Sequence, residues 1–170
     1  LYVEAGCDIA HEYYLAVLVD RDSNSLLVMA SREGGVDIEE VAESSPDSIH
    51  RMISRGMSGF DAFHCEDLGR KLGLSGTPLD KFSEMVSNLG SLFIQSDCSM
   101  IEINPLVETT GGDIVALDAK VSFDENASFR HPEWEGLRDY DEEEEIEVRA
   151  KKTGLSLSLI HISEPTRLWT

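Results

Sequence analysis

Two short segments of the chain, IEINP and ALDAK, carry side chains that could bind a divalent cation. Both have the apolar–polar alternation of a β-strand. Glu102 and Asn104 therefore share one face of the first strand, and Asp118 and Lys120 share one face of the second. Mg²⁺ takes a few oxygen ligands from a protein and completes its octahedron with water and nucleotide phosphates. The amide of Asn104 and the carboxylate of Asp118 are ligands of this kind, so the pattern suits a magnesium site on one face of a β-hairpin.

The register of that hairpin decides whether its polar side chains meet. A three-residue loop at 110–112 predicts Asn104 across from Asp118 and Glu102 across from Lys120. A two-residue Gly-Gly turn would place Asn104 opposite the alanine that follows Asp118, and the polar groups would fall on two faces. The three-residue register yields a coherent site, and glycine at the end of such a loop suits it. The alternative interpretation is a surface hairpin in which the Asn–Asp and Glu–Lys pairs are incidental.

Other segments must supply the sheet around this hairpin. Residues 13–20 are apolar and rich in aromatic and β-branched side chains, which predicts a buried strand. A polar turn follows, and residues 26–30 are the predicted hairpin partner. The two strands of the polar hairpin are predicted at 100–107 and 113–121.

Helix signals occupy the middle of the chain. Asp37 can cap a short helix, with Glu40 three residues later as in a capping box. A Ser-Pro pair at 45–46 predicts a second helix start, and apolar spacing predicts a helix over 61–72. A Thr-Pro pair at 77–78 opens the strongest helical pattern, whose apolar stripe we interpret as core. That stripe comprises Leu79, Phe82, Met85, Val86, Leu89, Leu92 and Phe93.

The chain is strongly acidic. Its 170 residues include 14 Lys plus Arg and 33 Asp plus Glu, a net charge of −19. Such a surface repels phosphate backbones and anionic lipid, which disfavours nucleic-acid and membrane functions. A nucleotide could still bind through a bound cation or locally gathered basic groups. The three cysteines, Cys7, Cys65 and Cys98, are widely spaced and odd in number, which fits a reducing compartment with each one a small buried hydrophobe.

Several further strings match one known family in order and spacing. IEINPL followed by LDAK is the most specific part, and EGGVDIEEVA is nearly as specific. Over residues 1–156 the chain resembles β subunits of succinate–CoA ligases. The strings that carry the resemblance are VEAGCDIAHEYYLAVLVD, MASREGGVDIEEVA, IEINPLV, ALDAK and DENASFRHPE.

The resemblance implies an α/β (α+β) fold: the C-terminal lobe portion of an ATP-grasp domain, with a mixed or antiparallel sheet flanked by helices. It implies Mg²⁺ and ATP (or GTP) as cofactors. The positions that match the family's magnesium ligands are Asn104 and Asp118. Glu102 matches an acid that faces a phosphohistidine arriving from the α subunit, although a cross-strand pairing with Lys120 is the simpler interpretation of that residue.

Three positions match residues that line the nucleotide in this family. Glu4 corresponds to a residue near the adenine, Cys7 to a backbone contact, and Glu12 to a further nucleotide contact. Cys7 departs from the family pattern, where threonine, alanine or another small residue is expected. For both glutamates the simpler alternative is a solvated acid.

The same resemblance predicts three regions along the chain. Residues 1–138 would form a partial ATP-grasp nucleotide-binding domain, and 139–156 an acidic linker or helix leading to a CoA-ligase domain that is missing here. Residues 157–170 resemble a translated sequencing-library adaptor, so we exclude them from fold and function. Because the chain starts within a strand-like segment rather than at a methionine, we expect it to be an internal fragment.

The family reaction joins succinate and coenzyme A with a nucleoside triphosphate, through succinyl phosphate and a phosphorylated histidine, in the citric acid cycle. The expected partners are the α subunit, which carries that histidine, and the nucleotide, succinate and coenzyme A. The expected location is the bacterial cytoplasm or the mitochondrial matrix, and the fragment alone should be inactive. A related acyl-CoA ligase, such as malate–CoA ligase, is one alternative. A non-catalytic acidic metal-binding module is another, and it predicts metal binding that does not depend on nucleotide.

Overall fold

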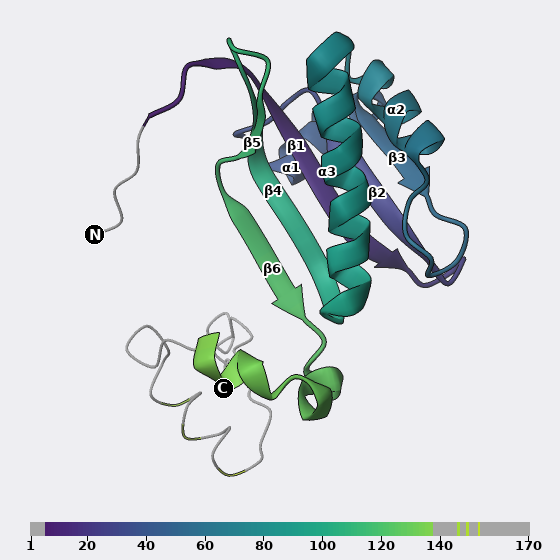
Figure 1. Ribbon diagram of the computed structural model, residues 1–170, viewed down its shortest axis with the longest axis vertical. Helices are drawn as coiled ribbons and strands as arrows, with labels where there is room; N and C mark the ends of the chain where they lie inside the picture. Colours follow the sequence, from purple (N-terminus) through teal and green to yellow (C-terminus); the bar gives the residue numbers. More distant parts are fainter. Residues whose placement is uncertain (1–5, 138–145, 147–148, 150–152, 154–170) are drawn as a thin grey trace, which may run out of the picture. The chain divides into compact units, whose positions relative to one another are not determined.

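The computed structural model describes residues 6–137 together with 146, 149 and 153, and the chain divides into two units, Leu1–Arg130 and His131–Thr170. The described part of the first unit combines strands and helices (Figure 1). Its strands are β1 (Ile9–Asp20), β2 (Ser25–Ser31), β3 (Ile49–Ile53), β4 (Cys98–Thr109), β5 (Ile114–Ala116) and β6 (Ala119–Phe123). Its helices are α1 (Ile38–Ser44), α2 (Ala62–Lys71) and α3 (Gly76–Gln95), with short 3-10 turns η1 (Pro46–Ser48) and η2 (Glu125–Arg130).

These strands form one antiparallel sheet of order β3-β2-β1-β4-β5, and β6 also pairs with β4. The predicted hairpin of residues 13–20 and 26–30 is confirmed as β1 and β2, although β1 begins earlier, at Ile9. Val17 pairs with Val28 in that hairpin, and both side chains are fully buried. The inner strands β1 and β4 carry most of the polar residues of the candidate site.

Helices α2 and α3 cover one face of the sheet, and α1 lies on the other side (Figure 1). Both covering helices were predicted, and α2 begins after Asp61, whose carboxylate accepts a hydrogen bond from the His64 N–H at 3.1 Å. Such a cap satisfies one of the free N–H groups of the first turn. The predicted stripe of α3 packs into the core as expected, except that Leu92 is 44% exposed. The most deeply buried members of the stripe are Phe82, Val86 and Phe93.

The predicted helix start at the Ser-Pro pair is confirmed, but the helix is only a short 3-10 turn. Pro46 does occupy the first turn of a helical segment, as its fixed φ allows, but that segment is the three-residue turn η1. The chain then enters β3, which pairs with β2 from Ile49↔Ser31 to Ile53↔Leu27. The sequence IHRMI has no regular alternation of apolar and polar residues that would predict a strand. Pairing with the neighbouring strand therefore decides its conformation.

The second unit contains the 3-10 turn η3 (Pro132–Leu137) among its described residues. The His131 ring stacks on Trp134 with centroids 4.4 Å apart, and its Nδ1 lies 2.9 Å from the Glu133 carboxylate. Residues 157–170 and nearly all of the acidic segment 139–156 lie outside the described residues, so the predictions for them stay predictions. Among the helices that the structure describes, none is long and apolar enough to cross a membrane.

Candidate functional site

The hairpin that follows α3 has the three-residue loop of the favoured register. Glu108 of β4 pairs with Ile114 of β5, and the Thr109 N–H donates to the Asp113 carbonyl at 2.9 Å. Gly112 closes the loop with φ of 81°, a conformation that glycine adopts without steric cost. The two-residue Gly-Gly turn is therefore wrong for this chain.

This register places Asn104 beside Asp118, as predicted. The Asn104 backbone N–H donates to the Asp118 carbonyl at 3.2 Å, and Glu102 pairs with Lys120. Asp118 lies at the break between β5 and β6 and is exposed, whereas Asn104 and Glu102 are half-buried. A carboxamide oxygen and a carboxylate are the hard oxygen donors that suit Mg²⁺. The described residues contain no group of three or more His, Cys, Asp or Glu that could hold a metal ion.

A bulge in β4 lies at the same point. The register between β1 and β4 shifts by one residue between Tyr13 and Leu15, so Tyr14 faces both Asn104 and Pro105. The Asn104–Pro105 peptide is cis. Proline has no N–H to donate to a neighbouring strand, and a bulge is one of the few places where an inner strand accommodates it. Bulges re-aim the side chains next to them, and here the re-aimed residue is the candidate metal ligand.

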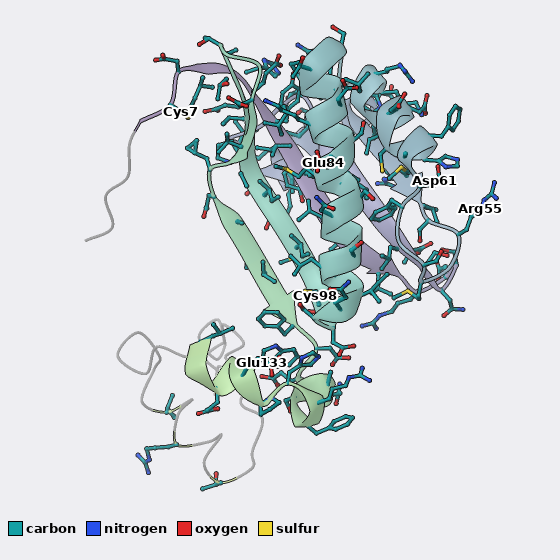
Figure 2. The ribbon with its side chains drawn as sticks, in the orientation of Figure 1. Cys7, Arg55, Asp61, Glu84, Cys98 and Glu133 are labelled. Atoms are coloured by element: carbon teal, nitrogen blue, oxygen red, sulfur yellow. The ribbon has the colours of Figure 1, made fainter. Side chains whose placement is uncertain are left out.

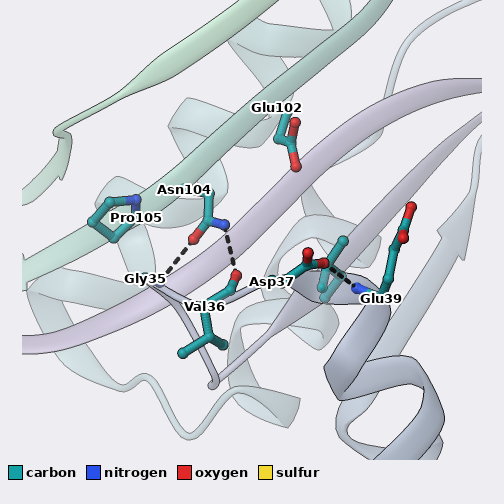
Figure 3. Close-up of a pocket in the computed structure, with 8 residues that line it drawn as sticks. Gly35, Val36, Asp37, Glu39, Glu102, Asn104 and Pro105 are labelled. Carbon is teal, nitrogen blue, oxygen red and sulfur yellow. Dashed lines mark hydrogen bonds between the residues drawn. The ribbon is translucent and has the colours of Figure 1, made fainter. Parts of the chain in front are cut away.

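An open pocket of about 520 Å³ lies between β4 and the segment that leads into α1 (Figure 3). Its ionisable groups are all acidic: Glu102 comes from β4, and Asp37 and Glu39 come from the start of α1. A phosphate group would be repelled by these carboxylates unless a cation lay between them. The residues that line the pocket are Gly35, Val36, Asp37, Ile38, Glu39, Glu102, Asn104 and Pro105.

The side chain of Asn104 is held by the backbone of the segment before α1. Its Oδ1 accepts from the Gly35 N–H at 2.7 Å, and its Nδ2 donates to the Val36 carbonyl at 2.9 Å (Figure 3). Asp37 then caps α1, with its carboxylate accepting from the Glu39 N–H at 2.8 Å. One wall of the pocket is thus tied to β4 by an amide that lies 69 residues away in sequence.

Two glycines allow this segment to approach β1 closely. A Cβ at Gly34 would lie 2.5 Å from backbone atoms of Tyr13. Gly35 has φ of 70°, and a Cβ there would lie 2.5 Å from a carboxylate oxygen of Glu12. Glu12 and Asn104 therefore meet the same glycine from two different strands.

Tyr14 is a buried residue whose phenol is influenced by the Glu102 carboxylate. Burial raises the pKa of Tyr14 to about 12, and the charge of Glu102 and a hydrogen bond to its carboxylate add to the shift. Tyr14 is 5% exposed and belongs to the same inner strand as Glu12. The neutral phenol can donate to Glu102 and thereby hold that carboxylate in place at the pocket wall.

The raised pKa of Tyr14 predicts a loss of stability at alkaline pH. The folded protein keeps this proton up to a pH near 12, whereas the unfolded chain releases it near 10. Stability from this group is therefore complete below pH 10 and is lost as the pH rises to 12, by about 2–3 kcal/mol. Urea unfolding of the wild type and of Tyr14→Phe, at about pH 8 and about pH 12, checks this. The variant should lose less stability over that interval, and an equal loss in both proteins would contradict the assignment.

The other predicted site residues differ in where they lie. Glu12 is half-buried on β1 beside Gly35, close to the pocket, while Glu4 lies outside the described residues. Cys7 is exposed on the segment before β1, so the expectation that every cysteine is buried is wrong for it (Figure 2). Cys65 and Cys98 are buried as expected.

Sequence reasoning missed the contacts made by the two glycines and by Tyr14. The sequence analysis assigns no contact to the Gly34-Gly35 pair, although a glycine pair directly before a helix cap is a signal of close backbone approach. Tyr14 was interpreted as a core strand residue, and its position opposite the bulge depends on the pairing of β1 with β4.

Comparison with known proteins identifies a family for this chain. The family model that describes the ATP-grasp domain matches residues 1–108. The β subunit of an ADP-forming succinate–CoA ligase from Sorangium cellulosum is 49% identical over 157 residues, which cover 92% of this chain and 39% of that protein. The corresponding subunit from Acidiphilium cryptum is 50% identical over 156 residues, with the same coverage of 92% and 39%. The chain thus spans about two fifths of the length of these relatives.

Among solved structures, the ATP citrate lyase from Methanothrix soehngenii, in complex with citrate and coenzyme A, superposes with a TM-score of 0.63. The two share 20% sequence identity, over 88% of this chain and 34% of the other. A similarity at that level of identity shows a common fold, the α+β arrangement of an antiparallel sheet flanked by helices.

Proposed function

This chain belongs to the ATP-grasp family, and from that premise we propose that it forms the magnesium–nucleotide face of a succinate–CoA ligase β subunit. The observation that carries the proposal is the hairpin register, which brings Asn104 alongside Asp118 next to the acidic pocket that contains Glu102. Identities of 49% and 50% to ADP-forming ligase subunits support the choice of reaction and favour ATP as the nucleotide.

Asn104 and Asp118 would hold Mg²⁺ through one oxygen ligand each, and the residues present fit that role. The bound ion would draw charge from the terminal phosphates of the nucleotide during phosphoryl transfer. Catalysis of this kind depends mainly on positioning and electrostatics. The ionisable side chains of the pocket, Asp37, Glu39 and Glu102, are all acidic and would repel the phosphate groups. Binding of the phosphates would therefore require the positive charge of the ion.

Glu102 would receive the histidine of the α subunit. A half-buried carboxylate can accept the N–H of one ring nitrogen, which fixes the tautomer and the orientation of the imidazole. The other ring nitrogen then faces the nucleotide phosphate. Tyr14 supports Glu102 in this role, because its hydrogen bond limits the directions that the carboxylate can take.

The nucleotide would lie along the start of β1, where Glu4, Cys7 and Glu12 are the contact residues we propose. The nearness of the Glu12 carboxylate to Gly35, which lines the pocket, supports the inclusion of Glu12 in this set. The complete enzyme would use the α subunit, succinate and coenzyme A, and the bacterial relatives favour a cytoplasmic location.

The proposal is tested by the dependence of metal affinity on nucleotide. The matching 157 residues of this chain would replace those of the Sorangium cellulosum β subunit, and the chimera would be assembled with the α subunit of that enzyme. Mn²⁺ suits the same oxygen ligands as Mg²⁺ and can be followed by electron paramagnetic resonance. We expect ADP to raise the affinity for Mn²⁺ at least ~10-fold, since phosphate oxygens complete the coordination. Equal affinity with and without ADP in a folded, assembled chimera would instead identify a nucleotide-independent metal-binding module.

A further inference from the structure

The carboxamide of Asn104 has one orientation that satisfies its neighbours. The Gly35 N–H requires an acceptor and the Val36 carbonyl requires a donor, and the observed amide supplies both, at 2.7 and 2.9 Å. A flipped amide would oppose donor to donor and acceptor to acceptor. The oxygen of an amide has two lone pairs, so the bond from Gly35 leaves one for a metal ion.

The Gly34-Gly35 turn leads into these backbone partners. It can lie this close to β1 only because neither of its residues has a side chain. A methyl group at Gly34 would collide with the backbone of Tyr13, and one at Gly35 would collide with the carboxylate of Glu12. The positive φ of Gly35 is a second reason why this position requires glycine, because residues with a Cβ rarely adopt a positive φ. Any side chain at position 35 would therefore move the turn away from Asn104 or displace Glu12.

We infer that the Gly34-Gly35 turn is a positioning element that orients the Asn104 oxygen toward the magnesium ion and links it to the nucleotide contact Glu12. This inference rests on the proposed function. Groups that hydrogen-bond to a metal ligand fix its orientation, and their loss typically lowers metal affinity or activity about 10–100-fold. Neither glycine has a side chain that could bind the metal, so both would act through Asn104.

Gly35→Ala tests the inference in the assembled chimera, with Gly56→Ala as its matched control. Gly56 has φ of 69°, almost the same as the 70° of Gly35, but an added Cβ there meets nothing within 4 Å. Both variants carry the same backbone strain, and only Gly35→Ala brings a methyl group against the Glu12 carboxylate. We expect Gly35→Ala to raise the Mg²⁺ concentration for half-maximal rate about 10–100-fold and to raise the KM for nucleotide, while Gly56→Ala changes neither more than ~2-fold.

Asn104→Asp gives a second test that does not depend on how the alanine variant folds. Aspartate keeps an oxygen ligand and adds negative charge, so a residue that served only as a ligand would bind Mg²⁺ as tightly or more tightly after the change. The variant cannot donate to the Val36 carbonyl, and it places a carboxylate against that oxygen. The positioning role therefore predicts weaker Mg²⁺ binding, by about 10-fold or more.

The possible outcomes separate this inference from the proposed function. Weaker Mg²⁺ binding in Gly35→Ala and Asn104→Asp, with Gly56→Ala unchanged, supports the positioning role. An active chimera in which Gly35→Ala or Asn104→Asp keeps the original Mg²⁺ dependence overturns the inference and leaves the proposed function standing. An assembled chimera of unaltered sequence that binds no magnesium–nucleotide overturns both.

Discussion

Replacing Asp118 with alanine is expected to reduce nucleotide-driven phosphorylation of the α-subunit histidine by ~10³-fold or more. Asp118 is the carboxylate of the proposed metal pair, and it lies beside Asn104 through a 3.2 Å backbone hydrogen bond. A metal that polarises phosphoryl oxygens contributes several kcal/mol to the transition state, and about 4 kcal/mol corresponds to ~10³-fold in rate. Transfer of labelled phosphate from ATP to the α subunit, measured in the assembled chimera, gives the rate directly.

Asp113→Ala is the matched control for this change. Asp113 lies on the same hairpin, is exposed, and pairs with Lys81 at the surface, away from the pocket. Surface ion pairs of this kind contribute little, about 0–1 kcal/mol, so the transfer rate should stay within ~2-fold. Retained activity in Asp118→Ala, or an equal loss in both variants, would rule out Asp118 as a specific metal ligand. Excess Mg²⁺ should restore part of the rate only if the defect is in metal binding.

The second large effect concerns stability: Phe82→Ala should lower the free energy of unfolding by about 3–5 kcal/mol. Phe82 is fully buried on α3, and its ring lies against α2 at Gly69, where a Cβ would come within 3.0 Å of it. Gly69 on the facing helix has no side chain and so leaves room for the phenyl ring. Removing the ring therefore leaves a cavity that backbone movement fills poorly. Urea unfolding monitored by circular dichroism measures the change.

Phe63→Ala provides a comparison of the same residue type on the neighbouring helix. Phe63 is 72% exposed, so its replacement should change the free energy of unfolding by less than about 0.5 kcal/mol. Similar losses in the two variants would mean that the α2–α3 contact does not stabilise the protein as the structure indicates. A change in the slope of the unfolding free energy against urea concentration, rather than in the midpoint alone, would point to altered compactness of the native or the denatured state.

Local chemistry was sufficient to predict the hairpin that carries the site. Strand side chains alternate with period two, so Glu102 and Asn104 had to share a face. A loop that ends in Gly112 favours three residues over two, and this sets Asn104 beside Asp118. The same kind of reasoning predicted α2, since a capping aspartate and an apolar stripe are both signals within one helix.

The sequence therefore determined, by itself, those features whose cause lies within a few residues: the strands β1, β2 and β4, the loop at Gly112, and the helices α2 and α3. Tertiary structure alone decided the strand β3, the bulge that sets Tyr14 against Asn104, and the exposure of Cys7. It also brought the Gly34-Gly35 turn to an amide 69 residues further along the chain. These features depend on which strands pair and how closely two segments approach, and such long-range contacts are set by packing of the whole sheet rather than by any local pattern.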